Sequence, residues 1–70
     1  MVLNDRTAYY VQRILDFVGN HPESYASLAV CRRALDKGLE AVTSDTLDRL
    51  ADHLATASRH EVEAYYDIIG

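Results

Sequence analysis

The chain has 70 residues, of which 49% are apolar and 26% are charged, and its formal net charge is −4. This composition is typical of an ordered protein and excludes a disordered chain, and the length limits it to one domain, residues 1–70. Broad nucleic-acid binding is disfavoured, because seven Lys and Arg residues stand against eleven Asp and Glu residues. Cationic contacts to phosphate supply most of that affinity.

Cysteine content and the opening residues indicate the cellular compartment. The lone cysteine, Cys31, excludes an internal disulfide. The first residues, MVLNDRTAYY, lack the basic and long apolar regions of a signal peptide, and no apolar run approaches the roughly 18 residues of a membrane span. We therefore expect a cytoplasmic protein. A core of this size rarely supplies more than about 3–5 kcal/mol, so we expect efficient helix packing or a second subunit to add to it.

The first expected helix covers residues 5–18. Asn4 or Asp5 fits its N-cap, because both side chains can accept a hydrogen bond from the first turn. Its apolar stripe has the helical spacing i, i+3, i+4, i+7 and consists of Val11, Ile14, Leu15 and Val18, widened by Tyr10 and Phe17. Gly19 fits a C-terminal stop in the left-handed conformation, and Pro22 lies shortly beyond it.

The second expected helix covers residues 22–37. Pro22 fits its first position, where a missing N–H costs nothing. The apolar stripe of this helix consists of Tyr25, Leu28, Cys31 and Leu35, with Ala29 and Ala34 beside it. Lys37 complements the helix dipole near the end, and Gly38 ends the helix.

Two further helices are expected over residues 44–56 and 59–69. Thr43 or Ser44 caps the first of them, whose stripe consists of Leu47, Leu50, Ala51 and Leu54. Ser58 and Glu61 form the S-x-x-E capping box of the last helix, whose stripe consists of Val62, Tyr65, Tyr66 and Ile69, with Ile68 beside it. A helix this short is not stable alone in water. We therefore predict an all-α, compact bundle of four short helices, about 5–18, 22–37, 44–56 and 59–69.

No residue pattern indicates catalysis or a cofactor. The histidines His21, His53 and His60 do not form the Glu-x-x-His pairs of a helical di-iron site. Cys31 lies on an apolar stripe, and the adjacent Arg32, a cation of the kind that lowers a thiol pKa, points away from it because neighbouring helix positions do not face each other. We therefore expect no catalytic residue, no metal and no cofactor, and predict that the protein is not an enzyme.

The middle of the chain resembles a helix-turn-helix. In ALDKGLEAVTSDTLDRLADHL, Ala34 and Gly38 keep the spacing of the motif's alanine and turn glycine, and Leu39 and Leu47 fall at its buried positions, whereas Ser44 departs from the pattern. The stretch TSDTLDRLADHL also resembles the fourth helix of lambda-repressor-like domains. This resemblance implies a nucleic-acid-binding regulator as the alternative function. Its phosphate contacts would come from Arg32, Arg33 and Lys37.

Charge argues against that alternative. A recognition helix lies between phosphate walls in the major groove. Here it would carry one basic residue, Arg49, against three acidic residues, Asp45, Asp48 and Asp52. We therefore predict the shape of the motif without DNA binding.

Tyrosine is the most informative residue type. Five occur in 70 residues, including the pairs Tyr9–Tyr10 and Tyr65–Tyr66, and tyrosine suits contact surfaces because a rigid apolar ring carries a hydrogen-bonding hydroxyl. We predict a protein-binding patch of Tyr9, Tyr65 and Tyr66, with Phe17 or Ile68 if they are exposed. The carboxylates that steer a basic partner towards it are Asp45, Asp48 and Asp52.

The predicted function follows from size, acidity and this patch. We expect a small acidic module that binds another protein, as an adaptor, an anti-activator or an inhibitor of the kind that phages and plasmids encode. A homodimer joined through the first and fourth helices would equally cover the patch.

Overall fold

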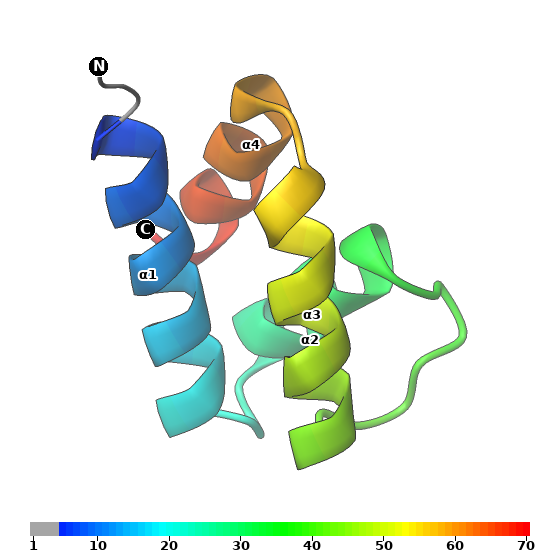
Figure 1. Ribbon diagram of the computed structural model, residues 1–70. Coiled ribbons are helices and arrows are strands. Elements are labelled where there is room, and N and C mark those ends of the chain that lie inside the picture. Colours follow the sequence, from blue (N-terminus) through cyan, green and yellow to red (C-terminus); the bar gives the residue numbers. More distant parts are fainter. Residues whose placement is uncertain (1–4) are drawn as a thin grey trace.

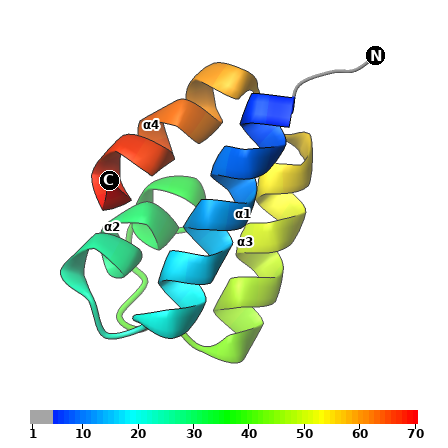
Figure 2. The same ribbon diagram turned by 90° about the vertical axis from the view of Figure 1, so that its left-hand side faces the viewer.

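Four α-helices and no strand occur in residues 5–70, the part of the chain that the computed structural model describes. The helices are α1 (Asp5–Asn20), α2 (Tyr25–Ala34), α3 (Ser44–Thr56) and α4 (Arg59–Ile69). α1 and α3 run antiparallel side by side, and α2 and α4 cross behind them (Figures 1 and 2). The predicted all-α bundle of four short helices is confirmed. An N-cap at Asn4 lies outside the described residues.

The core forms where the four helices meet. Each helix supplies two of its buried apolar side chains, which are Ile14 and Val18, Val30 and Cys31, Leu50 and Leu54, and Val62 and Tyr65. The apolar stripes predicted for α1, α3 and α4 pack on this core, apart from the half-buried Phe17 and Ala51. α4 packs most extensively against α1 and also against α2. The apolar end of the chain is therefore the inner face of a docked helix. In the part of the chain that the structure describes, no helix is long and apolar enough to cross a membrane.

The junction between α1 and α2 differs from its prediction. α1 continues through Gly19, and no described residue has a positive φ, so Gly19 does not form a left-handed stop. α1 ends at Asn20 because the residue before Pro22 is biased away from helical geometry. α2 begins at Tyr25 rather than Pro22, since the Ser24 hydroxyl accepts from the Ala26 N–H at 3.2 Å and caps the helix there.

The buried face of α2 was predicted only in part, since Cys31 is buried and Leu35 packs against the core as expected. Tyr25 is 85% exposed, and the buried residues of the helix are Ser27, Val30 and Cys31. Ser27 can be buried because its hydroxyl donates to the His21 carbonyl at 2.7 Å, which removes the cost of an unpaired polar group. Ser27 therefore holds α2 against the turn that follows α1.

The connection from α2 to α3 is longer than the prediction. α2 ends at Ala34, so Lys37 lies outside the helix. The Asp36 carboxylate accepts from the Gly38 N–H at 3.0 Å, a local turn that competes with helix continuation. Residues 35–43 form the connection, whereas a helix-turn-helix uses a turn of about 3–4 residues. The connection between α2 and α3 is therefore longer than the turn of a standard helix-turn-helix, and the prediction that Gly38 ends an extended α2 is corrected.

Candidate functional site

Three tyrosines form an aromatic cluster where α1 and α4 meet. The Tyr10 and Tyr66 rings stack with centroids 4.4 Å apart and planes inclined by 24°. The Tyr9 ring lies 6.0 Å from that of Tyr10, at 56°. Tyr9 is 55% exposed, whereas Tyr10 and Tyr66 are half-buried. We call Tyr9, Tyr10 and Tyr66 the tyrosine face. Tyr10 was predicted to widen the core stripe, and its part in this face was missed.

The other members of the predicted patch lie elsewhere. Tyr65 is only 3% exposed and belongs to the core, so its place in an exposed patch is corrected. Adjacent helix residues point in directions about 100° apart, which is why Tyr66 reaches the surface when Tyr65 does not. Phe17 and Ile68 are half-buried. The Phe17 ring lies against His21 with centroids 4.9 Å apart, and Ile68 packs against the core.

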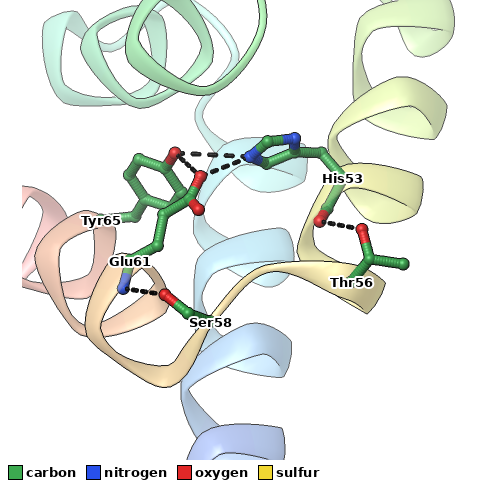
Figure 3. Close-up of polar contacts among 5 residues, drawn as sticks. All are labelled: His53, Thr56, Ser58, Glu61 and Tyr65. Carbon is green, nitrogen blue, oxygen red and sulfur yellow. Dashed lines mark hydrogen bonds and ion pairs between the residues drawn. The ribbon is translucent and has the colours of Figure 1, made fainter.

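A polar network of His53, Glu61 and Tyr65 joins the end of α3 to α4 (Figure 3). The His53 Nε2 atom lies 2.5 Å from Glu61 Oε2. The Tyr65 hydroxyl donates to the same carboxylate oxygen and lies 3.5 Å from His53 Nε2. The network spans the joint at Ala57 and Ser58, so it links the two helices across that joint.

The network shifts the pKa values of Glu61 and Tyr65 in opposite directions. The hydrogen bond from Tyr65, followed by that from His53, lowers the pKa of Glu61. Burial, followed by the hydrogen bond to Glu61, raises the pKa of Tyr65. At neutral pH an ionised carboxylate therefore accepts from a neutral phenol. A general acid needs a carboxyl pKa raised towards neutrality, and this environment moves the pKa of Glu61 the other way.

The predicted capping box pairs the Glu61 side chain with the backbone N–H of Ser58, and the structure gives this side chain other partners. Ser58 caps α4 as predicted, accepting from the Glu61 N–H at 3.2 Å. The Glu61 carboxylate, however, turns to His53 and Tyr65 (Figure 3) instead of completing the capping box. No periodicity links residues on two helices that a joint separates, so the sequence carried no signal for this network.

Charged residues occupy two exposed regions. Asp45, Asp48 and Asp52 are exposed on α3, and none of them has an ion pair within residues 5–70; we call these three the acidic face. The basic residues of the alternative function, Arg32, Arg33 and Lys37, are also exposed. Arg32 Nε donates to the Leu39 carbonyl at 2.7 Å, so this side chain holds the connection that follows α2.

Metal-ligating and nucleophilic side chains are dispersed. Among the described residues, no three His, Cys, Asp or Glu side chains gather as a metal site would require. Burial raises the pKa of the Cys31 thiol, which keeps the thiol protonated. No family model, curated protein or solved structure matches this chain.

Proposed function

We propose that this chain is a small, non-enzymatic protein-binding module of the cytoplasm that acts as an adaptor, an anti-activator or an inhibitor. Its contact surface is the tyrosine face. The observation that carries the proposal is the exposure of Tyr9, 55%, beside the stacked rings of Tyr10 and Tyr66. Because those rings already pack against each other, they lose little conformational entropy when a partner binds there.

The residue type supports a protein partner. Tyrosine is enriched at protein interfaces and among the residues that dominate binding energy. A tyrosine ring offers apolar area to a partner while its hydroxyl offers a hydrogen bond. Both halves of this contact are available at Tyr9, which lies on the first half of α1.

The acidic face favours a partner with a positively charged surface. Asp45, Asp48 and Asp52 have no cationic partner within residues 5–70, and the chain has a net charge of −4. A basic partner surface is therefore attracted as it approaches, which raises the association rate more than the final affinity. A second copy of this chain carries the same charge and gains nothing from this attraction. A homodimer would have to rely on the tyrosine face.

Photo-crosslinking tests the proposal directly. A photoreactive phenylalanine analogue replaces Tyr9 in one variant and the exposed Ala55 of α3 in a matched control. In a lysate of its native cells, the Tyr9 variant is expected to give a discrete adduct with one protein, and the Ala55 variant none. An adduct of two copies identifies the homodimer. If both positions give the same background and light scattering shows a monomer at all concentrations, the proposal is wrong.

A further inference from the structure

A second surface lies at the end of the molecule where α1 ends and α3 begins (Figure 1). A hollow of about 490 Å³ opens there between the start of α2 and the segment before α3. This volume falls within the roughly 300–1,000 Å³ of small-ligand sites. We call it the α2 pocket. Two smaller hollows adjoin it, since both share Pro22 with it, so the concave region extends around that proline.

The α2 pocket has an apolar wall and an anionic wall. Pro22, Leu28 and Val42 supply the apolar surface, and Glu23 and Glu40 supply two carboxylates. Both glutamates are exposed, and neither has a hydrogen bond or an ion pair within the described part of the chain. Two unpaired negative charges beside apolar surface attract a cation that carries apolar groups of its own.

Tyr25 adds a third element of recognition. This residue lines the same pocket and is 85% exposed, although the spacing of the sequence predicted it for the core. Cations favour the face of an aromatic ring. Arginine combines this preference with a forked group that pairs with carboxylates and an apolar stem that packs on aliphatic surface. The pocket thus contains a partner for each part of a cationic side chain.

We propose that the α2 pocket binds a peptide segment in which an arginine or lysine neighbours an aliphatic side chain. The cation lies between Glu23 and Glu40 and against Tyr25, and the aliphatic group covers Leu28 and Val42. No residue of the tyrosine face lines this pocket, so the inference stands independently of the function proposed above. Binding here gives the molecule two separate contact surfaces, one on α1 and α4 and one at the start of α2.

A random peptide library displayed on phage tests this inference with the whole protein as bait. The selected peptides are expected to carry Arg or Lys next to Leu, Ile or Val, and to shift the backbone amide signals of Tyr25, Leu28 and Val42. The affinity of a synthetic copy of the best peptide is then measured by fluorescence anisotropy. Replacing its cationic residue by Gln is expected to weaken binding.

Charge-matched variants locate the contact. The double variant Glu23→Gln/Glu40→Gln is expected to bind this peptide about three- to tenfold more weakly at low salt, a loss that two exposed charge pairs supply together. Tyr25→Ser is expected to weaken binding as well. The control Asp16→Asn/Asp67→Asn removes the same charge from exposed residues of α1 and α4 that do not line the pocket, and it leaves the affinity within twofold of the parent. Circular dichroism confirms that each variant is folded.

Four results of the peptide experiments would overturn the inference, and a fifth would come from the protein alone. They are the absence of any selected peptide, enrichment of acidic or uncharged peptides, equal affinity for both double variants, and amide shifts confined to the tyrosine face. Amide shifts at the α2 pocket that depend on protein concentration without peptide would assign it to a second copy, which also contradicts the proposal. A failed crosslink at Tyr9 leaves this inference intact, because no step of it uses that residue.

Discussion

Replacing Tyr65 by Phe isolates the polar network from the core. The substitution keeps the aromatic ring of a residue that is only 3% exposed, and it removes only the hydroxyl that donates to Glu61. Glu61 keeps its contact with His53 at 2.5 Å. Any change in stability therefore reports the hydroxyl rather than a cavity.

The expected loss follows from the exposure of the acceptor. A hydrogen bond to a charged group contributes about 1.5–3 kcal/mol, but the Glu61 side chain is 35% exposed, so water replaces part of the lost bond. We expect the free energy of unfolding of Tyr65→Phe to fall by about 1 kcal/mol, less than the full contribution of such a bond because the acceptor is accessible to water. In a domain of this size that lowers the melting temperature by about 4–8 °C.

The pH dependence gives the prediction its sharpest form. Folding raises the pKa of Tyr65, through burial and then through the bond to Glu61. Its contribution to stability is therefore complete below the unfolded pKa of about 10 and is lost as pH rises beyond it. Tyr65→Phe has no such group to titrate. The difference in stability between the parent and this variant is expected to shrink above about pH 10.

Urea unfolding followed by circular dichroism, from neutral to alkaline pH, provides the assay. Tyr25→Phe is the matched control, because the same atom is removed from a ring that is 85% exposed, and its unfolding free energy should equal that of the parent. Equal stability of Tyr65→Phe and the parent at neutral pH would refute the network's contribution. The same alkaline decline in both proteins would refute the raised pKa.

Four further outcomes are expected. The stability that comes from the lowered pKa of Glu61 is present above the ordinary glutamate pKa of about 4.5 and is lost as the pH falls below that value. The free energy of unfolding of Glu61→Gln, measured with urea, should therefore decrease less between neutral and acidic pH than that of the parent. Gly19→Ala should stabilise α1 by about 0.5 kcal/mol, since a Cβ there lies 3.4 Å from the flexible end of Leu47; a lower melting temperature would contradict this. Ser58→Ala should cost about 1 kcal/mol in urea unfolding by removing the cap of α4, and no change would show that the cap is dispensable. Mobility-shift assays with duplex DNA at low salt should show no complex, because the acidic face repels phosphate; a salt-sensitive complex would reverse that conclusion.

The sequence was sufficient where local rules decide the structure. The spacing of Ile14 and Val18 predicted the buried side of α1, and hydroxyl caps predicted the starts of α3 and α4. In α2 the pattern was right for Cys31 but wrong for Tyr25 and Ser27, because tertiary contacts override it there. Tyr25 is apolar yet exposed, and Ser27 is polar yet buried because the His21 carbonyl accepts its hydroxyl.

The candidate sites were predicted only in part, for the same reason. Exposure of Tyr9 and the surface position of the acidic face follow from helical periodicity. The stack of Tyr10 on Tyr66 depends on how α1 and α4 are rotated against each other, which no spacing within one helix encodes. The α2 pocket depends on the path of residues 35–43, and a local turn at Asp36 sets that path.

The pairing of α1 with α4 also determines when this chain can fold. These are the earliest and latest of the described helices, and they share the most extensive helix contact. During synthesis, the core that contains Ile14 and Val18 therefore cannot be completed until Val62 and Tyr65 have left the ribosome. Until then, apolar side chains of the nascent helices are exposed to solvent. Chains in this state are prone to aggregate and are substrates for chaperones.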